Sequence, residues 1–116
     1  MLQLTPQSRI CVALAPVDFR TGIAGLAALC RRAFGQNPLD GAISVFRNRT
    51  GTTLKVLYYD GQGYWLCTQR LSAGRLRGWP RVPGATVRLA ARELQVLLWN
   101  GCPDQAARAD AWRQVA

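Results

Sequence analysis

The sequence predicts an α+β fold: a mostly antiparallel β-sheet with an N-terminal helix packed on one face and a C-terminal helix beside the first. Three observations support this fold class. An apolar run at residues 9–14 precedes a segment, 19–34, that has the spacing of an amphipathic helix. Residues 42–71 read as consecutive strands joined by turn sequences. A second apolar helical pattern follows at residues 92–100.

The chain has the length of one domain. Its 116 residues, 49% of them hydrophobic, are enough to bury one core. We expect a single domain, residues 1–116, with its core in residues 9–101 and a polar tail at 102–116, for which a frayed helix around Trp112 is one interpretation. There is no apolar run of the about 18 residues that a membrane span needs, and no secretory signal pattern. We therefore expect a cytoplasmic protein.

The first strand is expected at residues 9–14, before Pro16. Asp18 then occupies a helix N-cap position, because its carboxylate can accept hydrogen bonds from the unpaired N–H groups of a first turn. The helix is expected from Phe19 to about Phe34. Its buried stripe is formed by Phe19, Ile23, Leu26, Ala27, Cys30 and Phe34.

Two glycines, Gly22 and Gly25, lie within this helical pattern. A glycine inside a helix costs about 1 kcal/mol relative to alanine, so each needs a structural reason. Because they do not lie in a strand-to-helix loop, they do not form a phosphate-binding glycine-rich loop. We interpret them as positions where the helix approaches the sheet closely.

The central segments predict two β-hairpins. Strands are expected at residues 42–47, 53–59 and 63–71. The sequence Asn48-Arg49-Thr50-Gly51 forms the first turn, and Asp60-Gly61 is a strong signal for a two-residue second turn.

The second turn determines which side chains lie opposite each other. A two-residue turn pairs Tyr59 with Gln62 and Val56 with Trp65. One face of the hairpin then carries Leu54, Val56, Tyr58, Trp65 and Cys67. The other face carries Lys55, Leu57, Tyr59, Tyr64, Leu66, Thr68 and Arg70. The first face is better suited to the core, and the second is either half covered or a binding surface.

A loop rich in glycine, proline and arginine follows at residues 72–85, where Pro80 and Pro83 exclude a central strand. A short last strand is expected at residues 86–89. The C-terminal helix, residues 92–100, ends at Gly101 and Pro103, with three leucines facing inward: Leu94, Leu97 and Leu98.

Positive charge is the most informative feature of the composition. The chain has 15 basic residues, of which only Lys55 is a lysine, six acidic residues and no histidine, giving a net charge of +9. Such an excess indicates a polyanionic partner, most commonly nucleic acid. Arginine suits phosphate because its planar fork donates two parallel hydrogen bonds. The codon bias of a GC-rich genome would explain the choice of arginine over lysine, but not the excess of bases over acids.

The acidic residues argue against an enzyme. Asp18, Asp60 and Glu93 are the only trio that could hold the two metal ions of a nuclease. Each has a structural explanation, as a helix cap, a turn residue and a first-turn acid that faces the helix dipole. There is no histidine to act as a general base, so we assign no catalytic residue.

The cysteines do not form a metal site. Cys11, Cys30, Cys67 and Cys102 lack the short spacings of zinc ligands, so we expect no metal and no other cofactor. The first three lie in apolar patterns, and we interpret them as small buried hydrophobic residues.

Basic residues cluster at the ends of the predicted hairpins. They surround the first turn, follow the second hairpin, and lie on the exposed face of the first helix. The residues expected to contact nucleic-acid phosphates are Arg20, Arg47, Arg49, Lys55, Arg70, Arg75, Arg77 and Arg81. Trp79, which precedes Pro80, is interpreted as a core anchor rather than a base-stacking platform. No helix-turn-helix pattern is present, so readout of bases in the major groove is not expected.

Several blocks of the sequence resemble one family. The segment Pro16-x-Asp18-Phe19-Arg20-x-Gly22-x-x-Gly25-Leu26 is similar to the opening signature of the small accessory protein of insertion sequence 66 transposons. This product of the element's second reading frame is often called TnpB, and it is unrelated to the RNA-guided nuclease of that name. The later matching blocks, within a resemblance that covers about residues 9–101, are Val45-Phe46-x-x-Arg49, Lys55-Val56-Leu57-Tyr58-Tyr59-Asp60-Gly61-x-Gly63, Arg70-Leu71-x-x-Gly74-Arg75, Trp79-Pro80 and the closing helix.

The resemblance implies a role in the transposition of a bacterial mobile element. In that family, a separate and larger transposase carries out strand transfer, so no catalytic residue is carried over to this chain. Our first hypothesis is a non-catalytic accessory protein that binds the DNA of the element's ends through its arginines. The alternative is an adaptor that binds the transposase through the half-apolar sheet face, and a metal-dependent nuclease is the third hypothesis. We expect neither a membrane nor a small-molecule substrate as partner.

Overall fold

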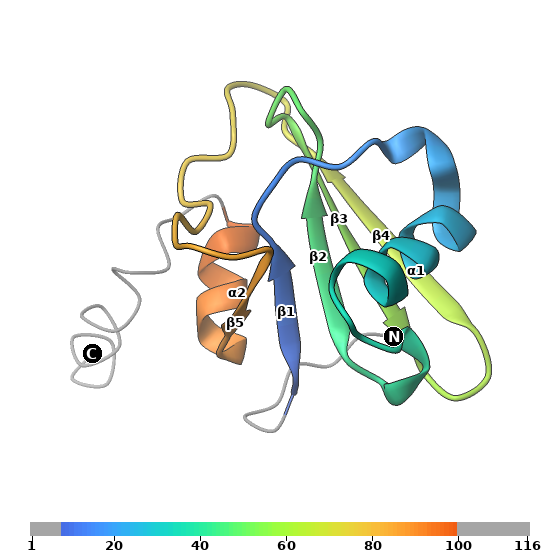
Figure 1. The fold of residues 1–116 in the computed structure, drawn as a ribbon. Coiled ribbons are helices and arrows are strands. Elements are labelled where there is room, and N and C mark those ends of the chain that lie inside the picture. The colour runs from blue at the N-terminus through green and yellow to red at the C-terminus, as the bar shows by residue number, and fades with distance from the viewer. Residues whose placement is uncertain (1–7, 100–116) are drawn as a thin grey trace.

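The computed structural model describes residues 8–99, which form a five-stranded sheet with a helix on each face (Figure 1). The strands are β1 (Ile10–Ala13), β2 (Ile43–Arg47), β3 (Thr53–Tyr59), β4 (Tyr64–Arg70) and β5 (Thr86–Leu89). The helices are α1 (Gly22–Ala33) and α2 (Ala91–Leu98), with the single 3-10 turns η1 (Phe19–Thr21) and η2 (Pro38–Asp40). The predicted α+β class is confirmed, whereas the expected tail at 102–116 lies outside the described residues.

The sheet is mostly antiparallel, as expected. Its strand order is β4-β3-β2-β1-β5. Only β1 and β2 run parallel, because α1 forms the crossover between them, and the other three pairings are antiparallel. The last strand, β5, returns to pair with β1 and forms the second edge of the sheet.

The two helices cover opposite faces of the sheet. The side chains of α2 pack against Ile10, Val12, Ile43, Val45, Leu54 and Val56. Those of α1 pack against Ala13, Phe46 and Leu57. Because neighbouring residues of a strand point to opposite faces, these two sets define two sides of the sheet. The expectation that the C-terminal helix lies beside the first was therefore wrong, since a sheet with apolar side chains on both faces needs a cover on each.

The edge strand β4 is less covered than its neighbours. On the α2 side, Trp65 is 44% exposed and Cys67 is also exposed. The interpretation of Cys67 as a buried hydrophobic residue was wrong, because α2 covers the middle of the sheet and does not reach β4. On the α1 side, Leu57 is buried while Thr68 and Arg70 are exposed. This face is half covered, which was one of the two expectations.

The start of the first helix differs from the prediction. Asp18 is the N-cap, and its carboxylate accepts a hydrogen bond of 2.9 Å from the Arg20 N–H. The first turn is η1, and α1 begins only at Gly22, whose φ of 68° suits glycine. A Cβ at Gly22 would meet nothing within 4 Å, and one at Gly25 would overlap the Thr21 side chain. Neither glycine serves close approach to the sheet, so that interpretation was wrong.

The second hairpin has a wider loop than a two-residue turn. Tyr59 lies opposite Tyr64 and Val56 opposite Cys67, so residues 60–63 form the connection. The Asp60 carboxylate stabilises this loop by accepting hydrogen bonds from the backbone N–H groups of residues 62 and 63 at 2.8 and 3.0 Å. The predicted register was wrong by two residues. Because two is an even number, each side chain still lies on the predicted face.

Candidate nucleic-acid interface

Three chain segments meet at one end of the sheet, at the top of Figure 1: the η1 region, the β2–β3 turn and the loop after β4. Backbone hydrogen bonds join them. The Val17 N–H donates to the Arg47 carbonyl at 2.8 Å, and the Leu76 N–H donates to the Gly51 carbonyl at 2.7 Å. We call residues 16–20, 48–55 and 70–76 the hairpin end.

A pocket of about 410 Å³ opens at the hairpin end, and Arg20 and Arg49 line it. The Arg20 side chain is 90% exposed and forms an ion pair with Asp18, with 2.8 Å between Nη2 and Oδ2. Its Nε lies 3.1 Å from both carboxylate oxygens. Hydrogen bonds from Arg20 hold the pKa of Asp18 at about 2, and the positive charge of Arg49 lowers it further. Asp18 therefore stays ionised and is paired with the Arg20 guanidinium at the surface.

Further basic residues lie around this pocket. The Lys55 Nζ is 5.0 Å from the centre of the Phe19 ring, a cation–π distance. Arg70 lies opposite Thr53, the first residue of β3, and points to the same face as Lys55. A Cβ built at Gly51 would lie 3.9 Å from the Cβ of Arg75. Of the predicted phosphate contacts, the structure thus brings together Arg20, Arg49, Lys55, Arg70 and Arg75.

Arg47 does not join this group. Its Nη2 donates a hydrogen bond of 2.9 Å to the Leu14 carbonyl oxygen, and its guanidinium carbon lies 5.4 Å from the centre of the Trp79 ring. Among the described residues, its buried Nε has no hydrogen-bond partner. Burial lowers the pKa of Arg47, as does the charge of Arg81. Trp79 is buried and donates from Nε1 to the Ala13 carbonyl at 2.8 Å, which confirms its expected role as a core anchor.

Arg77 and Arg81 lie apart from the hairpin-end pocket. They line a hollow of about 340 Å³ on the α2 side, together with Trp79, Arg88 and Glu93. The predicted set of arginines therefore divides between two faces of the molecule.

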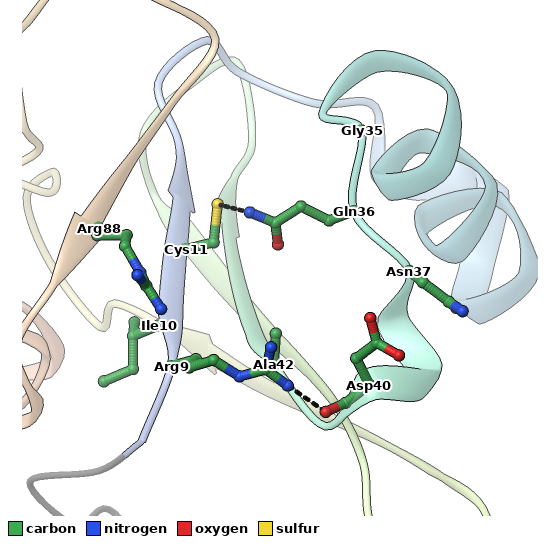
Figure 2. Close-up of a pocket in the computed structure, with 9 residues that line it drawn as sticks. All are labelled: Arg9, Ile10, Cys11, Gly35, Gln36, Asn37, Asp40, Ala42 and Arg88. Atoms are coloured by element: carbon green, nitrogen blue, oxygen red, sulfur yellow. Dashed lines mark hydrogen bonds between the residues drawn. The ribbon is translucent and has the colours of Figure 1, made fainter.

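A further basic hollow, of about 320 Å³, lies between β1 and the segment that follows α1 (Figure 2). The Arg9 guanidinium donates to the Asp40 carbonyl oxygen, and the Gln36 Nε2 donates to the Cys11 Sγ at 3.1 Å. Arg88 lies opposite Cys11 across the β1–β5 pairing. Neither Arg9 nor Arg88 was among the predicted contacts. Arg9 directly precedes β1, and Arg88 lies within β5. The two cations come together only because β1 and β5 pair, which no local sequence pattern shows.

A comparison with known protein families identifies the family of this chain. The sequence profile described as "IS66 Orf2 like protein" matches residues 8–108. The chain belongs to this family. Family membership supports an accessory role in the transposition of IS66-type insertion sequences, and the resemblance stated from the motifs is confirmed.

Two relatives of this IS66 Orf2-like protein occur in Sinorhizobium fredii. The uncharacterized protein y4hO is 39% identical over 98 residues, which cover 84% of each chain. The uncharacterized protein y4jC is 38% identical over 90 residues, covering 78% of this chain and 76% of its own. No solved structure gives a significant match.

The family motifs lie close together in the fold. One pocket is lined by residues of two separate blocks. The opening motif contributes Pro16, Asp18, Phe19 and Arg20, and the block Val45-Phe46-x-x-Arg49 contributes Arg49. The block that begins at Lys55 joins them, because Lys55 contacts Phe19. The hairpin end is therefore where separate family motifs converge.

The acidic residues of this IS66 Orf2-like protein are not brought together. Asp18 caps η1, and Asp60 lies at the opposite end of β3, where Trp65 Nε1 donates to it at 2.7 Å. That bond and those of the loop N–H groups hold the pKa of Asp60 at about 2. The Glu93 carboxylate accepts from the Ala90 N–H at 2.7 Å. Within residues 8–99, no three His, Cys, Asp or Glu side chains lie close enough together to hold a metal ion.

Two thiols of the described chain are buried, those of Cys11 and Cys30, and both are free. Burial raises the pKa of Cys30, which keeps its thiol protonated. Cys102 lies outside the described residues. No helix in the described part of the chain is long and apolar enough to cross a membrane.

Proposed function

We propose that this protein is a non-catalytic accessory factor of transposition that binds DNA backbone phosphates at the hairpin end. The observation that carries the proposal is the convergence of cations from three chain segments on one pocket and its rim. Those cations are Arg20, Arg49, Lys55, Arg70 and Arg75. Clustered basic side chains at one end of a domain are the electrostatic footprint of nucleic-acid binding.

The geometry of Arg20 supports a phosphate contact. Its Nε and Nη2 face the Asp18 carboxylate, and this ion pair favours one orientation of the guanidinium before any ligand arrives. This leaves Nη1 to donate to a phosphate oxygen. Arg49, exposed on the β2–β3 turn, lies across the same pocket and supplies a second cation. A fixed arginine loses less conformational entropy on binding than a mobile one.

The proposal gives the remaining predicted residues different roles. Arg47 belongs to the scaffold, because its guanidinium already binds the Leu14 carbonyl and lies over Trp79. Arg77 and Arg81, on the α2 side, would contact DNA only if the duplex extended around the loop after β4. We therefore expect the largest losses of affinity from substitutions at Arg20 and Arg49.

The adaptor alternative relied on the half-apolar face of the central hairpin. In the structure, α1 packs on that face and buries Leu57, with Tyr64 and Leu66 partly covered. The apolar side chains that a transposase would need there are thus already in contact with the protein's own helix. This favours DNA over the transposase as the partner of the basic end.

A salt titration tests the proposal. Fluorescence anisotropy of a labelled duplex from the element's ends would be measured over a range of salt concentrations. We expect the logarithm of the binding constant to fall linearly with the logarithm of the salt concentration, with a slope of about −0.9 for each phosphate contacted. The absence of binding at low salt would reject the proposal. Binding that persists without salt dependence would reject the phosphate contacts.

A further inference from the structure

The strand β4 forms one edge of the sheet. Among residues 8–99, its one strand partner is β3, and it forms one end of the strand order. Its sequence, Tyr64–Arg70, has one charged residue and no proline. Natural edge strands are usually protected by charges, proline or bulges, because unpaired N–H and C=O groups bind other strands. The whole stretch from Cys67 to Arg70 is exposed.

The hydrogen bonds to β3 define which backbone groups of β4 point outward. The Leu71 N–H donates to the Thr52 carbonyl at 2.9 Å, and the Asp60 N–H donates to the Gly63 carbonyl at 3.1 Å. In an antiparallel pair, hydrogen-bonded positions alternate along the strand. The odd-numbered residues of β4 therefore face β3. The even-numbered residues, from Tyr64 to Arg70, direct their N–H and C=O groups to the free edge.

We propose that two copies of this protein associate by antiparallel pairing of their β4 strands around a two-fold axis at Cys67. This inference is independent of the proposed DNA binding. Only one symmetric register pairs the full length of β4, and it places Tyr64 opposite Arg70 of the second copy. In that register, Cys67 lies opposite Cys67 of the second copy. The outward groups of the even-numbered residues then form about eight hydrogen bonds between the copies.

The side chains of β4 suit this register. Arg70 lies opposite a tyrosine ring, a favourable partner for a guanidinium, and the two copies of Arg70 stay at opposite ends of the interface. A register shifted toward Arg70 would lose paired residues and bring these two charges together. Trp65, which is 44% exposed in the single chain, gains a neighbour in Gln69 of the second copy. Self-pairing thus brings a single charged residue of each chain, Arg70, into the interface.

Cysteine crosslinking tests the pairing directly. Cys67 and its counterpart occupy a non-hydrogen-bonded position, where Cα atoms are about 4.5 Å apart, within the range for a disulfide. The test uses the full chain with Cys102→Ser, and diamide as the oxidant that takes two electrons and two protons from the two thiols. We expect rapid formation of a disulfide-linked dimer that is absent in Cys67→Ser, because Cys11 and Cys30 are buried.

A pair of variants tests the register. In a chain with Cys67→Ser and Cys102→Ser, the double substitution Trp65→Cys and Gln69→Cys should crosslink rapidly, because these positions lie opposite each other. Trp65→Cys alone should not, because its two copies would be about 14 Å apart. Equal crosslinking of both variants would overturn the proposed register.

Substitution of Thr68 tests the backbone contacts without a thiol. The Thr68 N–H points to the free edge, so Thr68→Pro removes an intermolecular donor and leaves the β3–β4 hydrogen bonds in place. Thr68→Val keeps the N–H and is the matched control. By sedimentation velocity we expect the unmodified chain and Thr68→Val to be dimers and Thr68→Pro, folded by circular dichroism, to be a monomer.

Salt separates this association from DNA binding. Two chains of net charge +9 repel each other, and salt screens that repulsion, so dimerisation should strengthen as salt is raised. DNA binding should weaken under the same change. An unmodified chain that stays monomeric at high salt and high protein concentration, without diamide crosslinking through Cys67, would overturn the inference. That result would leave the proposed DNA binding untouched.

Discussion

The Arg47 guanidinium carbon lies 5.4 Å from the centre of the Trp79 ring, and its Nη2 donates to the Leu14 carbonyl oxygen at 2.9 Å. One side chain thus connects the end of β2, the segment after β1 and the loop that follows β4. Trp79 completes this connection by donating from Nε1 to the Ala13 carbonyl. These contacts hold together residues that flank the three segments of the hairpin end.

Arg47→Ala should therefore reduce stability more than DNA binding. It removes a hydrogen bond and a cation–π contact, so we expect a loss of about 2 kcal/mol in the free energy of unfolding. Arg49→Ala, two residues further on and exposed, is the matched control and should change stability by no more than about 0.5 kcal/mol. Urea unfolding followed by tryptophan fluorescence measures both. Equal stability of the two variants would contradict the scaffold role of Arg47.

Acid should destabilise the protein through Asp18 and Asp60. The pKa of each carboxyl is lowered from 3.8 to about 2 by its hydrogen bonds in the folded state. Their contribution to stability is therefore fully present above the unfolded pKa of about 4 and is lost as pH falls from about 4 to about 2.

Asp18→Asn checks this linkage. The amide oxygen can still accept the Arg20 N–H, but the ion pair is lost. We expect lower stability than the unmodified chain at neutral pH and a smaller decrease between about pH 4 and pH 2. Urea unfolding at several pH values gives the profile. A decrease as large as that of the unmodified chain would show that Asp18 does not contribute to it.

The glycines of the first helix should differ from a loop glycine in their tolerance to alanine. Gly22→Ala places a side chain at a φ of 68° and a ψ of −166°, a backbone region that is essentially restricted to glycine, which costs about 1–3 kcal/mol. Gly25→Ala forces an overlap with Thr21 and should also destabilise the protein. Gly63→Ala is the control, because a Cβ there meets nothing within 4 Å and its backbone is not left-handed. Thermal unfolding should rank Gly63→Ala closest to the unmodified chain, and a different ranking would contradict these roles.

Local patterns predicted most of the fold because they act through neighbouring residues. The alternation of side chains assigned Val56 and Leu57 to the correct opposite faces, and Asp18 was correctly predicted as a cap. The turn at Asp60 was predicted too narrow, because its carboxylate also binds the loop and Trp65, contacts that a turn signal does not encode.

The features that the sequence did not predict depend on contacts between residues distant in the chain. Arg47 was predicted to contact phosphate because it is basic. Its contact with Trp79, a residue distant in sequence, takes Arg47 out of the basic surface, and this contact is known only from the fold. The hollow at Arg9 and Arg88 depends on the pairing of β1 with β5. The exposure of Cys67 depends on where α2 packs on the sheet. None of these is encoded in a local pattern.

The most direct test of the central claim compares two charge reversals in DNA titrations. Arg49→Glu changes the hairpin end, whereas Arg31→Glu makes the same change in net charge in the last turn of α1. We predict that Arg49→Glu weakens binding to element-end duplex by about tenfold or more and lowers the salt slope by about one, while Arg31→Glu has a much smaller effect. Equal losses for the two variants would contradict the assignment of DNA binding to the hairpin end.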